Sequence, residues 1–350
     1  MSNATLTPPG ARTADERMGQ KSTFSKLLGR PEIGALVGAI ALFAFFALVA
    51  PTFLQPSSFA TVLYGSSTIG IMAVGVSLLM IGGEFDLSTG VAVISSALSA
   101  SLFSWYFGMN VWVGVLLALL VSLLIGFING WILIKTQLPS FIVTLATFLM
   151  LAGLNLALTR AIGDSVSSPK ISQMDGFDSA RAIFASSVTM GGVNVKVTVF
   201  FWLVLVLIAS WILLRTTVGN WIFAVGGDAN AARAVGVPVT ATKIGLFMGV
   251  GFCGWILGMH NLFAFDAVQS GEGVGNEFLY IIAAVIGGCL LTGGYGSAVG
   301  GAIGAFIFGM ANKGIVYAEW NPDWFKFFLG LMLLVATIVN LVVKRRADLK

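Results

Sequence analysis

The sequence predicts an all-α, polytopic membrane protein with about ten transmembrane helices. Hydrophobic residues make up 57% of the chain and charged residues 10%, and the mean hydropathy is +0.95. A soluble domain of this length has a far more polar composition. A helix needs roughly 20 apolar residues to cross the hydrocarbon core, and runs near this length recur along the chain. They do not alternate in the short segments of about ten residues that transmembrane strands require.

The apolar runs fall in a regular order along the chain. They lie at 33–50, 60–81, 90–107, 111–134, 141–159, 197–214, 244–265, 277–292, 298–311 and 325–343. The eighth and ninth are the least continuous because glycines interrupt them. We therefore divide the chain into a polar tail at 1–30, a transmembrane domain at 31–343 and a short tail at 344–350. The tail at 1–30 lacks a short apolar core with a cleavage site, so we expect the first helix to be an uncleaved anchor.

Basic residues beside short loops predict the orientation, because they favour the cytoplasmic side. Five of them precede the first helix: Arg12, Arg17, Lys21, Lys26 and Arg30. With ten crossings, Lys135, the loop from Arg215 to Lys243 and the cluster at 344–346 are also cytoplasmic. The long loop at 160–196 carries basic residues and is expected outside, where the rule weakens for long loops. Both termini are then cytoplasmic.

Several classes of chemistry have little support in the sequence. No phosphate-binding loop of the form Gly-x-x-x-x-Gly-Lys-[Ser/Thr] is present, and no metalloprotease or dinucleotide motif appears. Cys253 and Cys289 fall inside predicted helices, which favours buried thiols over a disulfide. His260 stands alone without a cluster of metal ligands. We expect no metal, no cofactor and no enzymatic activity in this chain.

The stretch Gly82-Gly-Glu-Phe-Asp-Leu-Ser-Thr-Gly90 places two carboxylates between two apolar spans. Charge at membrane depth costs a few kcal/mol or more, so such residues face water, a cavity or a partner. The glycines predict a broken helix over 82–90. Asp86 or Ser88 is a candidate cap for the following helix, and equally a candidate pathway residue. Glu84 lies either in the pathway or at the cytoplasmic surface.

A second break is predicted near 293–297, again between two apolar spans. It has its own pathway candidates, and these are Gly293, Gly294, Gly296 and Ser297. Gly-Gly followed by Ser occurs in both breaks, which indicates an internal repeat of the kind that transporters carry. Close packing of Gly-rich helices is the alternative explanation.

The segment 219–238 is short and rich in Gly and Ala, with basic residues at either end. We interpret it as a helix lying flat on the cytoplasmic face, where small side chains let a partner protein approach closely; the alternative is an ordinary loop. The candidate coupling residues are Gly226, Gly227, Asp228, Ala231, Ala232, Arg233 and Gly236.

Few polar side chains in the apolar runs are candidates for substrate contact. Asn129 and Asn155 are polar residues in otherwise apolar helices, and Trp131 lies close to Asn129 in sequence. Amide groups and aromatic faces suit a small polar solute. Asn in a membrane helix also serves as a hydrogen bond between helices, and this alternative stays open.

Three ordered motifs resemble the membrane permeases of ribose- and xylose-type sugar ABC importers, in the branched-chain-amino-acid and sugar permease superfamily. Residues 83–90 resemble their Gly-x-Asp-Leu-Ser-x-Gly motif, and 225–237 resemble their Gly-x-Asn-x-x-Ala-Ala-x-x-x-Gly segment. The third match is Gly271-Glu-Gly followed by 282–288 and the break at 293–297. The chain departs from these motifs at Glu84, where a glycine is usual, and at Asp228 and Asn230, where Asn and an acidic residue are usual.

The resemblance implies the permease subunit of an importer for a monosaccharide or similar small polar solute. The implied partners are a cytoplasmic ABC ATPase, an extracytoplasmic substrate-binding protein, a second permease copy in a homo- or heterodimer, and the lipid bilayer. No nucleic acid is implied. The alternatives are a permease for branched-chain amino acids, nucleosides or inositol, an ion-coupled secondary transporter that uses Glu84 and Asp86, and a passive channel.

Overall fold

A computed structural model describes residues 31–348, and the regular secondary structure in that range is helical except for one hairpin. Eight helices are long and apolar enough to cross a membrane. They are α2 (Pro31–Val49), α3 (Pro56–Ile81), α4 (Thr89–Phe107), α5 (Val111–Thr136), α6 (Ser140–Gly163), α8 (Val197–Arg215), α11 (Val239–Phe265) and α13 (Ala298–Tyr317). Two further helices, α12 (Asn276–Ile286) and α14 (Trp324–Asp348), match the remaining apolar runs. The predicted fold class is therefore confirmed, and the tail at 1–30 lies outside the described residues.

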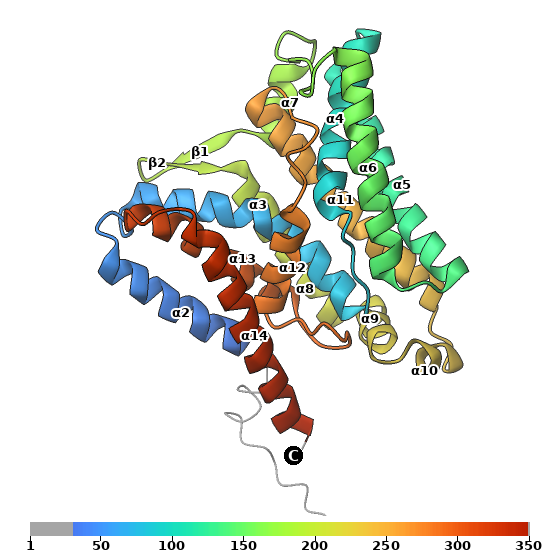
Figure 1. The fold of residues 1–350 in the computed structure, drawn as a ribbon, viewed down its shortest axis with the longest axis vertical. Coiled ribbons are helices and arrows are strands. Elements are labelled where there is room, and N and C mark those ends of the chain that lie inside the picture. The colour runs from blue at the N-terminus through green and yellow to red at the C-terminus, as the bar shows by residue number, and fades with distance from the viewer. Residues whose placement is uncertain (1–30, 349–350) are drawn as a thin grey trace, which may run out of the picture.

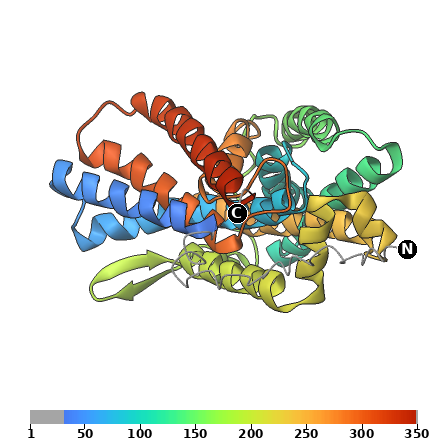
Figure 2. The same cartoon turned by 90° about the horizontal axis from the view of Figure 1, so that it is seen from below.

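The helices form an inner and an outer set (Figures 1 and 2). About two-thirds of the residues in the apolar windows of α3, α4 and α11 are buried, and 61% in α13. In α2, α5, α6 and α8 the buried share is a third or less. Small residues permit the closest crossings. A Cβ on Gly126 of α5 would overlap the backbone of Phe247 in α11, so the two helices meet backbone to backbone.

The two ends of the bundle carry different short elements (Figure 1). One end, called the α7 end here, holds α7 (Phe177–Phe184) and the antiparallel hairpin β1 (Ser187–Met190) and β2 (Val193–Lys196). The opposite end, the α10 end, holds α9 (Thr217–Gly227) and α10 (Ala229–Ala234). The sequence predicts a helix in 219–238, at the α10 end, but only a loop in 160–196, at the α7 end.

His260 links α7 to the bundle. Its Nδ1 lies 2.8 Å from the carbonyl oxygen of Phe184, and its Nε2 lies 3.0 Å from the hydroxyl of Tyr64 in α3. This imidazole belongs to α11 and is fully buried. Its two hydrogen bonds join α11 to α7 and to α3. Cys253 and Cys289 are buried free thiols. Among the described residues, no group of three or more His, Cys, Asp or Glu residues could hold a metal ion.

Candidate functional site

Two helices break in the same way. The N–H groups of three consecutive residues from Gly82 donate to carbonyls four, three and five residues earlier, at 3.1, 2.9 and 3.2 Å. The three N–H groups from Gly287 repeat this pattern at 2.9–3.1 Å. The second residue of each set is a glycine with positive φ, Gly83 at 83° and Gly288 at 96°.

These shared caps place the second break differently from the sequence repeat. The equivalent glycine pairs are Gly82-Gly83 and Gly287-Gly288, upstream of the Gly293-Gly294 pair that the sequence suggested. The predicted run 277–292 therefore stops as a helix at Ile286. Residues 287–297 form a longer turn than 82–88 before Ser297 accepts a hydrogen bond from the N–H of Gly300, at 2.9 Å, and caps α13.

The two turns meet beneath α9, at a point we call the glycine junction, formed by Gly83, Gly226, Gly293 and Gly294. The N–H of Gly294 donates to the carbonyl of Ile81 at 2.8 Å, which joins one turn to the other. A Cβ on Gly226 would overlap that same carbonyl and lie 2.7 Å from the Gly294 nitrogen. A Cβ on Gly293 would lie 2.6 Å from the Cα of Gly83 and 2.7 Å from the Gly226 carbonyl oxygen. Only glycine permits this three-way backbone contact.

Glu84 forms an ion pair with Lys243, in which the Nζ of the lysine donates to Oε1 of the carboxylate. The side chains are only 10% and 15% exposed respectively. Lys243 lies in the first turns of α11, shortly after α10, so the pair ties this helix to the first broken turn. The sequence identified both residues but not their pairing, because they are separated by 159 positions.

Asp86 and Ser88 belong to a buried hydrogen-bond network. Oδ1 of Asp86 accepts from the Ser88 N–H at 2.8 Å and from its hydroxyl at 2.6 Å. Asn129 of α5 donates from Nδ2 to the Ser88 Oγ at 3.0 Å, and its Oδ1 accepts from the Thr147 hydroxyl of α6 at 2.7 Å. The network therefore fastens the first turn to α5 and α6. Ser88 is the N-cap residue of α4, but its side chain makes no capping bond.

The three substrate-contact candidates do not come together. Asn155 accepts from Ser95 at 2.9 Å and donates to the Val91 carbonyl at 3.2 Å, which joins α6 to α4. Asn129 is fully buried in the network above, whereas Trp131 is 48% exposed on another face of α5. Both amides have the geometry of hydrogen bonds between helices, and a role in substrate contact stays a prediction.

Replacing Asn129 with Ala tests the network. The change removes two buried hydrogen bonds, the one that Asn129 donates to the Ser88 hydroxyl and the one that it accepts from the Thr147 hydroxyl, and each contributes about 0.5–1.5 kcal/mol. We expect a lower thermal unfolding temperature, with transport falling in proportion to the amount of folded protein and an unchanged KM. Trp131→Leu, on the exposed face, is the matched control and should change neither quantity. A raised KM for Asn129→Ala in stably folded protein would instead show substrate contact.

The surface pair α9–α10 is ordered by two side-chain caps and a small apolar cluster. Thr216 caps α9, and Oδ1 of Asp228 accepts from the N–H groups of Asn230 and Ala231 at 2.8 and 3.0 Å to cap α10. Ala232 is 4% exposed and packs with Val225 and Val239. Ala231 and Arg233 of α10, and Val235 just after it, are among the exposed residues of this segment, and Val235 is 80% exposed.

The Asp228 cap gives a prediction about pH. The N–H groups of Ala231 and Asn230 hold the pKa of the Asp228 carboxyl below its ordinary value. A lowered pKa means that the stabilisation is complete above the ordinary value and is lost as pH falls through the folded-state pKa. We expect Asp228→Ala to loosen α10, measured as faster amide hydrogen exchange over 229–237 at pH 7. Asp228→Asn should keep the cap, because Asn is an equally good N-cap. Equal exchange in all three proteins would contradict the capping role.

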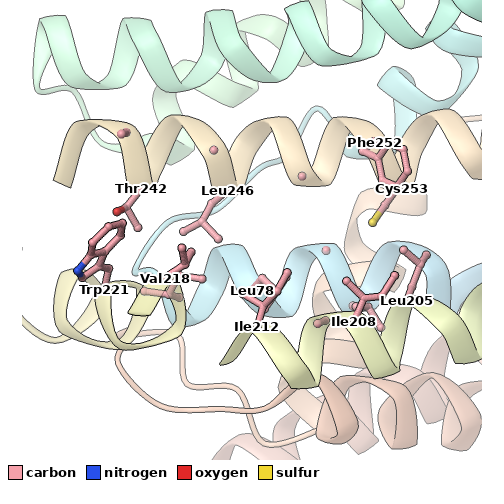
Figure 3. Close-up of a pocket in the computed structure, with 17 residues that line it drawn as sticks. Leu78, Leu205, Ile208, Ile212, Val218, Trp221, Thr242, Leu246, Phe252 and Cys253 are labelled. Atoms are coloured by element: carbon pink, nitrogen blue, oxygen red, sulfur yellow. The ribbon is translucent and has the colours of Figure 1, made fainter. Parts of the chain in front are cut away.

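An apolar groove of about 410 Å³ runs between α3, α8, α9 and α11 (Figure 3). Its lining is almost entirely aliphatic and aromatic. The hydroxyl of Thr242, at one end, is already bonded to the Pro238 carbonyl at 3.0 Å. A sugar needs several hydrogen-bonding groups, so this groove is not a site for a polar solute.

The eight helices that are long enough to cross a membrane are typical of a polytopic transport protein, as are the two helices that end in the same kind of broken turn beside a surface helix pair. Residues 58–337 match the family model described as "Branched-chain amino acid transport system / permease component". The chain belongs to this permease family.

Curated relatives match over nearly their whole length. The probable ABC transporter permease protein YphD of Escherichia coli K12 is 30% identical over 321 residues, 91% of each chain. The ribose import permease protein RbsC of the same strain is 28% identical over 307 residues, 87% of this chain and 92% of the relative. The fructose import permease protein FrcC of Rhizobium meliloti is 26% identical over 312 residues, 89% and 85%. No solved structure matches.

Proposed function

We propose that this chain is the permease subunit of an ABC importer for a monosaccharide or a similar small polar solute. Its relatives carry the names of import permeases for ribose and fructose, over about nine-tenths of the chain. The observation that carries the proposal is the glycine junction, where one surface helix touches both broken helices. ATP hydrolysis takes place in a separate partner chain, and an extracytoplasmic binding protein delivers the solute.

The protein lies in the bacterial inner membrane with the α10 end in the cytoplasm. The exposed Lys135, Arg215 and Arg233 of the α10 end support this orientation, because the positive-inside rule applies to short loops. The segment 160–196 at the α7 end also carries basic residues, but the rule weakens for a segment of this length. Both termini are then cytoplasmic. The α7 end faces outward, where α7 and the hairpin form a surface for the binding protein.

The pair α9–α10 is the coupling element to the ATPase. Ala231 and Val235 offer a small apolar contact surface, and Ala232 holds α10 against Val225 and Val239. A push on α10 reaches Gly226 through α9, and Gly226 touches both turns without an intervening side chain. Because backbone contacts have no rotamers to absorb the motion, the two turns move together.

The Glu84–Lys243 pair provides a parallel connection. It transmits a displacement of α11 to the first turn, while the network around Asp86 connects this turn to α5 and α6.

Two copies of the permease, each on its own ATPase or ATPase half, form the path between them. Both carboxylates are already bonded, which favours coupling and structural roles over ion carriage.

Exposed substitutions on α10 test the coupling assignment. We expect Ala231→Arg or Val235→Asp to abolish transport and to remove the ATPase from the purified complex, while membrane insertion remains normal. Ala232 is the wrong position for this test, because a large side chain there would disturb α10 itself. Val188→Asp on β1, also an exposed valine (47%), is the control and should retain the ATPase. Normal ATPase retention and transport in the α10 variants would refute the assignment.

A further inference from the structure

The apolar groove has a buried floor and an exposed rim. Leu246 and Cys253 of α11 and Val74 of α3 lie on the floor, each less than 9% exposed. Ile208 of α8 and Phe252 of α11 lie on the rim, 49% and 38% exposed. Figure 3 shows the aliphatic side chains of α3 and α8 facing those of α11 along the length of the groove. The groove thus lies among membrane-spanning helices and opens towards the lipid.

On the α11 side of the groove, two of the lining residues are glycines and have no side chain to fill it. A Cβ built on Gly245 or Gly249 would meet no atom within 4 Å, although both residues line the groove. Larger side chains at these positions would therefore fit sterically and occupy the groove. A long, unbranched hydrocarbon chain suits a slot with these walls, since about 0.8 kcal/mol accompanies each CH₂ that is buried.

One end of the groove has the chemistry of a membrane interface. Trp221 of α9 closes this end beside Thr242, and its ring nitrogen points away from the groove (Figure 3). Trp is typical of the boundary between hydrocarbon and headgroups. Arg215 lies three residues beyond Ile212, which places it on the groove-lining face of α8. Arg215 is exposed and has no ion-pair partner in the described part of the chain.

We propose that this groove binds one anionic phospholipid. One acyl chain lies along α11 past Gly249, and the headgroup phosphate pairs with Arg215. Under the orientation above, the site faces the cytoplasmic leaflet, which carries the anionic surface charge. Val218, Trp221 and Ile222 line the groove from α9, so the lipid lies directly against the coupling element. The proposal does not depend on the transported substrate, because the apolar lining of the groove does not suit a polar solute.

Native mass spectrometry of the full chain in detergent, titrated with phosphatidylglycerol or phosphatidylcholine, tests the site. We expect one phosphatidylglycerol to be retained most tightly. Gly249→Leu should weaken this binding about tenfold or more, because displacing two methylenes costs about that factor. Arg215→Gln should weaken phosphatidylglycerol about fivefold and phosphatidylcholine less, because the choline of the second lipid already compensates the charge of its phosphate. Gly153→Leu is the matched control, since Gly153 also has no atom within 4 Å of its Cβ but lies on exposed α6.

Three results would overturn the proposal. Equal retention in Gly249→Leu and Gly153→Leu would place the lipid outside the groove. Equal affinity for the two lipids would remove the role of Arg215, as would an equal loss of both lipids in Arg215→Gln. Circular dichroism of each variant verifies folding, and Gly245→Leu provides a second groove-filling variant if Gly249→Leu fails to fold.

Discussion

Gly226→Ala is expected to abolish transport. The added methyl group would overlap the Ile81 carbonyl and crowd the Gly294 nitrogen, both of which belong to backbone and cannot rotate away. Overpacking in a well-packed core costs about 1–3 kcal/mol, and backbone-against-backbone overlap belongs at the upper end of that range. α9 must therefore shift, and we expect at least a tenfold loss of uptake by the assembled transporter.

The neighbouring glycine provides the control for this experiment. A Cβ on Gly227 meets no atom within 4 Å, so Gly227→Ala changes the same helix end without touching the glycine junction. Each variant adds one methyl group, at neighbouring positions, but only the methyl group at position 226 would overlap backbone atoms. We expect normal uptake for Gly227→Ala, and similar uptake by both variants would remove the glycine junction from the mechanism.

Breaking the Glu84–Lys243 ion pair should have the next largest effect. Glu84→Gln leaves Lys243 largely buried and without its anionic partner, and Lys243→Met leaves the Glu84 carboxylate without its cation. Breaking a buried pair costs about 3 kcal/mol, whereas replacing both partners is often neutral. We expect each single variant to lose stability and transport and the double variant Glu84→Gln/Lys243→Met to recover most of both. Thermal unfolding and uptake complete the double-mutant cycle.

The same cycle separates coupling from ion carriage. If Glu84 carried a proton or cation, every variant that lacks its carboxylate would fail to transport, including the double variant. Recovery in the double variant therefore supports a positioning role for the ion pair. Stable but inactive double-variant protein would contradict this role.

Local signals in the sequence predicted much of the architecture. Apolar run length predicted eight helices that are long enough to cross a membrane and also located α12 and α14, because the hydrocarbon thickness fixes a minimum span. The predicted run 277–292 is helical only to Ile286, so α12 is shorter than expected. Gly82 and Gly83 predicted the first break, because a glycine at positive φ ends a helix. The small residues and flanking charges of 219–238 indicated a surface helix, and the structure has helices there.

Contacts between distant positions could not be predicted in this way. No local pattern joins Glu84 to Lys243 or Gly226 to Ile81, since each contact depends on how three helices pack. The sequence pattern pairs Gly82-Gly83 with Gly293-Gly294, because a serine follows both glycine pairs. In the structure, the cap equivalent to that of Gly82-Gly83 lies at Gly287-Gly288. Asn129 and Trp131 are close in sequence, but residues two positions apart on a helix point to different faces.

Reconstitution tests the central claim most directly. The chain is assembled in proteoliposomes with a candidate ABC ATPase and a candidate substrate-binding protein, with ATP enclosed on the α10 side and candidate solutes such as ribose outside. We predict accumulation that requires ATP hydrolysis, persists in the presence of an uncoupler and is lost with Gly226→Ala but not Gly227→Ala. Accumulation by the chain alone, driven by a proton gradient and abolished by the uncoupler, would contradict the account.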